Sequence, residues 1–389
     1  MPDLPAVQRR LVVFLPGFEA IPAAAHGRRF VREARRTAPI YRMSLPQDIP
    51  VAQEGDLTVV RIAAESPTGI TETELHIDSL DAIAAAYAAR PPLRRIASGY
   101  RALFDFAVTG TAWRFARTSW RYVIFYLFPF ILPLLALLLA WSAWNASGGT
   151  AFGLAAGGLA AAAIAWVALK RLHLMLVMDD WTFARELAHG DQPAYEAALE
   201  RLAADTVRRA KEEPVDEIVF AAHSMGAMAA VALAARIVRT SSPLPPLGLL
   251  TVGSSLMKVA LHPEAKSLRR DVETIGQYGV PWLEVQSLTD PIHFYKSHPL
   301  TSLGIAVSRS VQVMRVRFRE QLDPARYERI KRDFFAVHRQ FVSGVDRPSD
   351  YAFHAILCGP TPFGVIAARR GLEPPVLEAD TSNVGNRTP

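Results

Sequence analysis

Short apolar runs bounded by turn residues alternate along the chain with longer stretches whose apolar residues recur at helical spacing. Such runs predict strands at residues 11–15, 217–221, 247–252 and 282–286, and alternation of apolar and polar residues predicts further strands at 56–63, 72–77 and 311–318. The stretches that predict helices cover residues 23–36, 79–89, 172–188, 194–211, 227–239 and 327–341. Residues 350–358 form a late apolar run that we interpret as a strand-like or extended segment. This alternation predicts an α/β fold with a mostly parallel sheet flanked by helices.

A much longer apolar run covers residues 122–144, which carry no charged side chain. About 20 apolar residues cross the hydrocarbon core of a bilayer as one helix. A second run, residues 151–169, is rich in alanine and glycine, and we interpret it as the second helix of a membrane hairpin. A re-entrant or interfacial helix is the alternative for this run. Gly153 and Gly157 form a G-x-x-x-G pattern that favours close packing on the first helix, although alanine- and glycine-rich composition alone also produces such a pair.

Basic residues gather at the outer ends of this hairpin. The arginines before it are Arg90, Arg94, Arg95, Arg101, Arg114, Arg117 and Arg121, and Lys170, Arg171 and His173 follow it. By the positive-inside rule, both outer ends are predicted to be cytoplasmic, with the turn at residues 145–150 on the other side. The mixture of arginines and aromatic residues over 94–120 is typical of a segment that lies along a membrane surface. We therefore expect an integral protein of a bacterial-type inner membrane.

Length and composition agree with one globular core that carries a membrane insertion. The chain has 389 residues, of which 50% are apolar, enough to bury a full core without a second globular domain. We divide it into a first core part (1–89), a juxtamembrane segment (90–121), the hairpin (122–170), a second core part (171–370) and a tail expected to be disordered (371–389).

The net charge and the single cysteine narrow the chemistry. The formal charge of +6 is modest, and no recognisable nucleic-acid-binding module accompanies it, so we expect no nucleic-acid partner. Cys358 is the only cysteine, which excludes an intramolecular disulfide. Its apolar neighbours favour a buried structural thiol over a catalytic one. No spacing typical of a metal site or a phosphate-binding loop is present, so we expect neither a metal nor a cofactor.

The segment Ile218–Val219–Phe220–Ala221–Ala222–His223–Ser224–Met225–Gly226–Ala227 carries the most specific chemical signal. An apolar run stops at Ser224, small residues lie two before and two after it, and a helical pattern follows. A sharp turn between a strand and a helix holds such a serine in a strained backbone, which requires small neighbours. The motif reads A-x-S-x-G and resembles the nucleophile elbow of α/β-hydrolase esterases, lipases and thioesterases. An ordinary turn between a strand and a helix is the alternative.

The start of the chain extends this resemblance. The run at 11–15 followed by Pro16-Gly17-Phe18-Glu19 is similar to the first core strand and oxyanion loop of an α/β hydrolase that lacks the two early edge strands. The resemblance implies that the backbone N–H groups of Phe18 and Met225 stabilise an oxyanion, with an ordinary Pro-Gly turn as the alternative.

The resemblance also implies a catalytic acid and a histidine, in that order, after the serine. Asp290 lies just beyond the predicted strand at 282–286 and is expected to be the acid, with helix capping as the alternative. His338 is our preferred base because apolar residues flank it, while His354, in the apolar run at 350–358, is the other candidate. Both are farther from the last predicted strand than is usual in this family.

Together these features imply an α/β-hydrolase-like core with an inserted two-helix membrane hairpin and a cytoplasmic catalytic domain. The implied activity is that of a membrane-anchored serine hydrolase, which forms an acyl-enzyme on an ester or thioester with Ser224, His338 and Asp290. The position of the hairpin favours a hydrophobic or lipid-like substrate. The alternative is a non-catalytic membrane scaffold or binding protein on a hydrolase fold, and the oligomeric state stays open.

Overall fold

The computed structural model describes residues 6–78, 80–240 and 243–373, and an eight-stranded sheet runs through its centre. The strands are β1 (Arg9–Leu15), β2 (Val51–Glu54), β3 (Leu57–Ser66), β4 (Gly69–Ile77), β5 (Glu217–His223), β6 (Leu247–Val252), β7 (Trp282–Ser287) and β8 (Val311–Val316). Their order across the sheet is β2-β3-β4-β1-β5-β6-β7-β8. In this order, the six neighbouring strands β4, β1, β5, β6, β7 and β8 are parallel, whereas β2 pairs with β3 and β3 pairs with β4 in antiparallel fashion.

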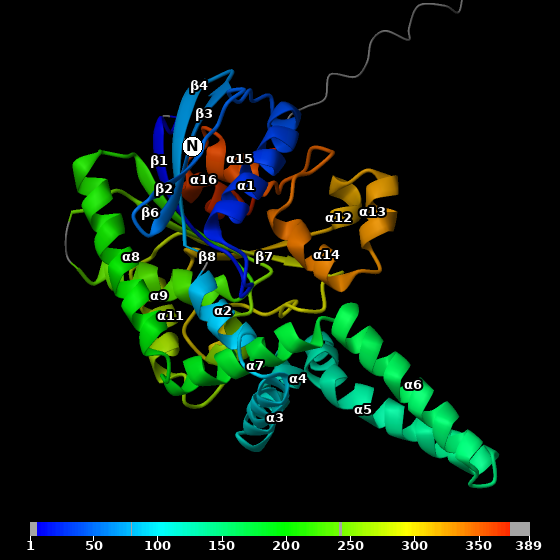
Figure 1. Ribbon diagram of the computed structural model, residues 1–389. Helices are drawn as coiled ribbons and strands as arrows, with labels where there is room; N and C mark the ends of the chain where they lie inside the picture. The colour runs from blue at the N-terminus through cyan, green and yellow to red at the C-terminus, as the bar shows by residue number, and fades with distance from the viewer. Residues whose placement is uncertain (1–5, 79, 241–242, 374–389) are drawn as a thin grey trace, which may run out of the picture.

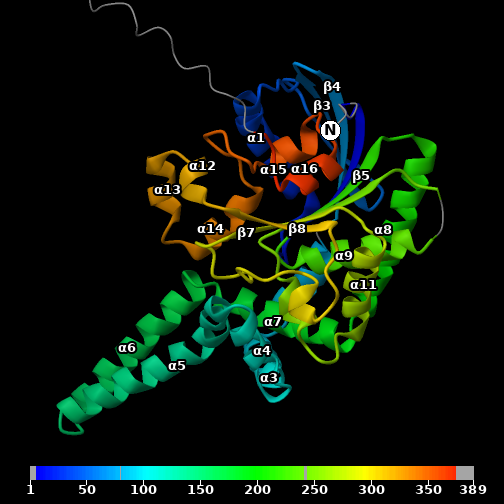
Figure 2. The same cartoon turned by 180° about the vertical axis from the view of Figure 1, so that it is seen from behind.

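Helices cover both faces of this sheet (Figures 1 and 2). One face packs against α1 (Ala23–Thr37), α15 (Phe353–Cys358) and α16 (Phe363–Arg369), and the other against α8 (Pro193–Glu212), α9 (Gly226–Val238) and α11 (Lys266–Gln277). In β1, Val12 and Phe14 pack on the face of the sheet that α1 covers, whereas Leu11 and Val13 pack on the face that α9 covers. Burial on both faces explains why the central strands read as continuous apolar runs. The predicted α/β architecture with a mostly parallel sheet is therefore confirmed.

Edge strands are present, although they do not precede β1. The chain after β1 and α1 forms β2 and β3, which extend the sheet beyond β4. The predicted strands at 56–63 and 72–77 correspond to β3 and β4, whereas β2 was not predicted.

Two predictions near the end of the chain are wrong. The single helix expected at 327–341 is broken into α13 (Pro324–Ile330) and α14 (Phe334–Arg339), because the Asp333 carboxylate accepts the Ala336 N–H at 2.9 Å and starts a new helix. The run at 350–358 is not a strand, since its last six residues form α15. All six are buried, so no polar position marks the helical period.

The remaining helices lie between β4 and β5, between β6 and β7, and after β8. Between β4 and β5 the chain forms α2 (Asp81–Ala88), α3 (Pro92–Val108), α4 (Thr111–Thr118), α5 (Trp120–Ala146), α6 (Ala151–Lys170) and α7 (Leu174–His189) before α8. After β6 lies the short α10 (Leu256–Ala260), and α12 (Phe318–Gln321) follows β8. Apart from residues 371–373, the tail expected to be disordered lies outside the described residues.

Helices α5 and α6 form an antiparallel pair that projects from the body (Figures 1 and 2). With 27 and 20 residues, both are long and apolar enough to cross a membrane, and few of their residues are buried by the protein. The glycine pattern lies in the contact between them, because a Cβ on Gly157 would approach the Ala140 Cα to 2.9 Å. The same contact encloses Gly153, so these glycines serve packing inside the hairpin.

Candidate active site

Ser224 occupies the sharp turn between β5 and α9, at the centre of the parallel sheet. Its φ of 55° lies in the left-handed region, which a residue other than glycine adopts only under structural constraint. The turn is tight because the end of β1 lies against it: a Cβ on Gly226 would fall 2.1 Å from the Leu15 carbonyl oxygen. The small residue expected two positions after the serine is therefore a steric requirement.

Asp290 and His338 form a buried pair on the same edge of the sheet. Asp290 lies three residues beyond β7 and is 1% exposed, while His338 lies on α14. The His338 Nδ1 is 2.7 Å from the Asp290 Oδ2, and the Asp290 Oδ1 accepts the Ile292 N–H at 2.9 Å. A neutral His338 that donates from Nδ1 keeps its lone pair on Nε2. This Nε2 is buried and has no hydrogen-bond partner among the described residues.

A second imidazole, that of His293, also contacts Asp290. The His293 Nε2 accepts the Ser287 N–H at 3.1 Å, so its proton resides on Nδ1, which donates to the Asp290 backbone carbonyl at 3.1 Å and also lies 3.1 Å from the Asp290 Oδ2. Burial alone raises the pKa of Asp290, but the His338 and His293 imidazoles outweigh it and hold that pKa below its usual value. His293 therefore contacts both the backbone and the side chain of Asp290, a contact that the D-x-x-H spacing hints at but does not establish.

The serine and the histidine face the same cavity without touching. The nearest polar partner of the Ser224 Oγ is the Ser255 Oγ at 3.4 Å, and no hydrogen bond joins Ser224 to His338. Ser255, which the sequence analysis did not single out, follows β6 and donates its N–H to the Ser224 carbonyl at 3.1 Å. Catalytic hydrogen bonds are often long in ligand-free enzymes and shorten when substrate binds.

Two backbone N–H groups beside the serine lack a hydrogen-bond acceptor in the part of the chain that the structure describes. Among the described residues, neither the Phe18 N–H nor the Met225 N–H has a hydrogen-bond acceptor, and both residues line the cavity. The loop backbone approaches the serine closely, since a Cβ on Gly17 would lie 3.1 Å from the Ser224 Cβ. Met225 also precedes the first turn of α9, where the helix dipole favours negative charge.

The cavity itself is small, about 50 Å³, and mixed in character. Its apolar wall is formed by Phe18, Phe125, Leu176, Val177, Met225, Ile292 and Phe335, and its polar groups include Glu19, Asp180 and Arg339. Typical ligand sites enclose about 300–1,000 Å³, so a substrate larger than water requires these walls to part.

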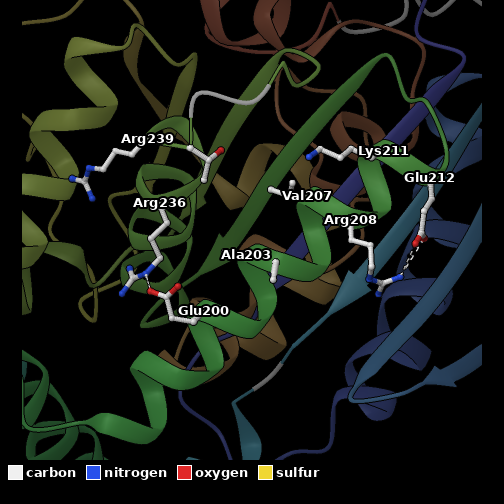
Figure 3. A pocket seen from close by; sticks show the side chains of 10 residues that line it. Glu200, Ala203, Val207, Arg208, Lys211, Glu212, Arg236 and Arg239 are labelled. Atoms are coloured by element: carbon white, nitrogen blue, oxygen red, sulfur yellow. Dashed lines mark hydrogen bonds and ion pairs between the residues drawn. The ribbon is translucent and has the colours of Figure 1, made fainter.

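A larger hollow of about 870 Å³ lies between α8 and α9, away from this site (Figure 3). Its charged side chains largely satisfy one another, as in the pairs Arg208–Glu212 and Arg236–Glu200. Its described lining residues include no nucleophile beside a base, so we do not regard it as a reaction site.

The alternative base, His354, lies elsewhere. It is buried on α15 between Phe30 and Phe353, with no hydrogen-bond partner for either ring nitrogen among the described residues. Burial lowers the pKa of His354 to about 3, so it stays neutral. Cys358 is also buried, as expected, and burial raises the pKa of its thiol to about 12.

One cluster has the composition of a metal site. Asp105, His189 and His262 place one ligand atom each within 4.8 Å of one another. However, the His262 Nδ1 accepts the Glu264 N–H at 3.2 Å, so its Nε2 carries the proton that it donates to Asp105 at 3.1 Å. A metal ligand needs the opposite arrangement, with Nε2 unprotonated and Nδ1 donating. The cluster is therefore a hydrogen-bonded link between α3, α7 and the end of α10.

The comparisons with known proteins add no assignment: no family model, no curated protein and no solved structure matches this chain.

Proposed function

We propose that the protein is a membrane-anchored serine hydrolase of the α/β-hydrolase type, which cleaves an ester or thioester of a hydrophobic or lipid-like substrate. One observation carries this proposal. The buried Asp290–His338 pair leaves the His338 Nε2 lone pair facing the cavity that contains Ser224, whose backbone is strained.

The chemistry follows from these positions. As the Ser224 Oγ bonds to the substrate carbonyl carbon, the His338 Nε2 takes the hydroxyl proton and Asp290 stabilises the resulting imidazolium. The Phe18 and Met225 N–H groups stabilise the oxyanion, and one such donor is worth about 3 kcal/mol of barrier. Collapse of the intermediate breaks the bond to the leaving oxygen or sulfur, which takes the proton from His338. Water then attacks the acyl-serine, gives its proton to His338, and the released serine recovers it.

The membrane placement rests on the hairpin and its charges. Helices α5 and α6 have the length and composition of membrane spans. Arg94, Arg101 and Arg117 are exposed beside the hairpin and have no carboxylate within ion-pair distance among the described residues. Basic flanks favour the cytoplasmic side, so we place the catalytic domain in the cytoplasm and the hairpin in a bacterial-type inner membrane.

A non-catalytic scaffold is the alternative, and two observations favour it. The Ser224 Oγ lies near Ser255 rather than His338, and the cavity is too small for a lipid in this conformation. A scaffold would keep the fold and the hairpin but would not react with an electrophile.

A fluorophosphonate probe applied to membranes distinguishes the two functions. We expect wild type and His354→Ala to be labelled, and Ser224→Ala and His338→Ala to remain unlabelled. Failure to label well-folded wild type, in a sample where a control serine hydrolase reacts, would assign the protein to the scaffold class.

A further inference from the structure

Both ends of the membrane hairpin contribute to the wall of the catalytic cavity. Phe125 lies near the start of α5, before that helix leaves the body, and Leu176 and Val177 lie on α7, the first helix after the hairpin. Phe125 is 6% exposed, whereas the adjacent Ile124 is 55% exposed on the outer side of the same helix. The apolar wall beside Ser224 therefore includes a residue of the same helix that continues outward into the hairpin.

The polar side of the same cavity carries a cation without a counterion. Arg339 directly follows His338, is half-buried and lines the cavity. Its guanidinium has no hydrogen-bond or ion-pair partner among the described residues, whereas the nearby Arg326 pairs with Asp346 at 3.2 Å. Partial burial of an unpaired charge is unfavourable, and a guanidinium matches the geometry of a phosphate group.

An acceptor in this cavity is also unpaired. The Glu19 Oε2 is buried and has no donor among the described residues, although Glu19 lines the cavity beside the oxyanion loop. A carboxylate oxygen that repels phosphate can accept a hydrogen bond from a hydroxyl group. The cavity thus presents an apolar wall, a guanidinium and a carboxylate oxygen around one nucleophile.

We propose, on the basis of the hydrolase function above, that the substrate is the acyl ester of a phosphate-bearing glycerolipid drawn from the membrane. The acyl chain enters along α5 and parts the wall at Phe125, the phosphate binds Arg339, and a glycerol hydroxyl donates to Glu19. A soluble phosphate-bearing acyl thioester would supply the same chain and phosphate. The hairpin origin of the wall favours the lipid.

The decisive experiment uses full-length protein in nanodiscs. It compares three substrates that carry the same acyl chain: a monoacylglycerol, the corresponding acylglycerol phosphate and soluble acyl-coenzyme A. We expect the ratio of kcat/KM for acylglycerol phosphate over monoacylglycerol to be about 10- to 100-fold, the range for a hydrogen-bonded charge pair. Arg339→Gln should bring this ratio close to one, mainly through KM. The control Arg332→Gln removes an equal charge from an exposed position outside the cavity and should keep the wild-type ratio.

The acyl wall is tested with neighbouring variants on a series of chain lengths. Phe125→Leu should shift the preferred chain length upward, because it widens the wall, whereas Ile124→Leu on the lipid side should not. An unchanged ratio in Arg339→Gln, or faster turnover of acyl-coenzyme A than of the lipid, would overturn the inference. Fluorophosphonate labelling of Ser224 in the same samples separates the two proposals: labelled protein without phosphate preference refutes only the lipid assignment, and unlabelled wild type refutes both.

Discussion

Replacing Asp290 with asparagine tests the proposed catalytic pair with almost no change in side-chain volume. One carboxylate oxygen accepts the His338 Nδ1–H at 2.7 Å and lies 3.1 Å from the His293 Nδ1, which also donates to the Asp290 backbone carbonyl, while the other oxygen accepts the Ile292 N–H. In Asp290→Asn the amide oxygen remains with the Ile292 N–H. The amide NH₂ then faces two N–H donors that previously shared a negative charge.

The magnitude follows from the tautomer that this change imposes. His338 avoids two facing N–H donors when its Nδ1 accepts a hydrogen bond from the amide NH₂, and the imidazole proton then resides on Nε2. A protonated Nε2 cannot take the Ser224 proton, and the equivalent change in a serine protease lowers kcat about 10⁴-fold. We therefore expect a loss of about 10³- to 10⁴-fold here, which corresponds to about 4–5.5 kcal/mol of barrier.

The rate of fluorophosphonate labelling in nanodiscs measures this loss directly. Asp323→Asn is the matched control, because Asp323 has a side chain that is 64% exposed and lies at the start of α13, outside the cavity. A thermal melt confirms that each variant folds. If Asp290→Asn folds normally and labels within threefold of wild type, Asp290 does not orient the base and the proposed mechanism is wrong.

Three further predictions concern stability. Gly226→Ala should destabilise the fold by about 3 kcal/mol or more in a urea titration, since its Cβ would lie 2.1 Å from a β1 carbonyl oxygen. The control Gly364→Ala should be tolerated, because the nearest atom to its Cβ would be 3.8 Å away. Burial raises the pKa of Glu284 from 4.5 to about 8, so the folded state binds this proton more tightly and the free energy of unfolding falls as pH rises between these values. Glu284→Gln should therefore raise the melting temperature at pH 9 and flatten its pH dependence; a lower melting temperature there would contradict the assignment. Gly157→Leu should lower the thermal stability of the detergent-solubilised protein by separating the hairpin helices, whereas Gly158→Leu, with open space around its Cβ, should not; equal effects would refute the packing argument.

The sheet was predictable where strands are central and their ends are marked by turn residues. Strands β1, β5 and β6 appear as short, largely apolar runs because both of their faces are buried. The same reasoning fails for α15, whose six residues are all buried and therefore lack the polar positions that reveal a helix. It also fails for β2, whose four residues are all at least partly exposed and show no apolar alternation.

Local order explains how much of the site could be anticipated. Ser224 and Asp290 each follow a predicted strand directly, so the sheet edge that they share is visible in the sequence. His338 and His354 both lie in apolar surroundings after the last strand, and spacing does not separate them. What distinguishes His338 is its contact with Asp290, 48 residues earlier in the chain, which spacing along the sequence does not reveal.

The hairpin joins the body through the start of α5 and through α7, and different interactions hold these two segments. This difference indicates where the cavity opens. Helix α7 is fixed by charge: Asp179 pairs with Arg95 at 2.6 Å, and Asp180, which lines the cavity, pairs with the buried Lys258 behind Ser255.

The end of α5 at the body has no ion pair among the described residues: the Tyr122 ring stacks on Phe294 at 3.8 Å between centroids, and Arg121 donates to the Leu288 carbonyl at 3.1 Å. Breaking a buried ion pair costs about 3–5 kcal/mol, whereas apolar surfaces slide past one another and exchange partners with lipid at less cost. A substrate that needs more than the present 50 Å³ should therefore enter by displacing α5 at Phe125, with α7 as the fixed wall. The helix that yields is the one that continues into the proposed membrane hairpin, so under the proposed function the acyl chain of a lipid would replace the protein contacts that it disrupts.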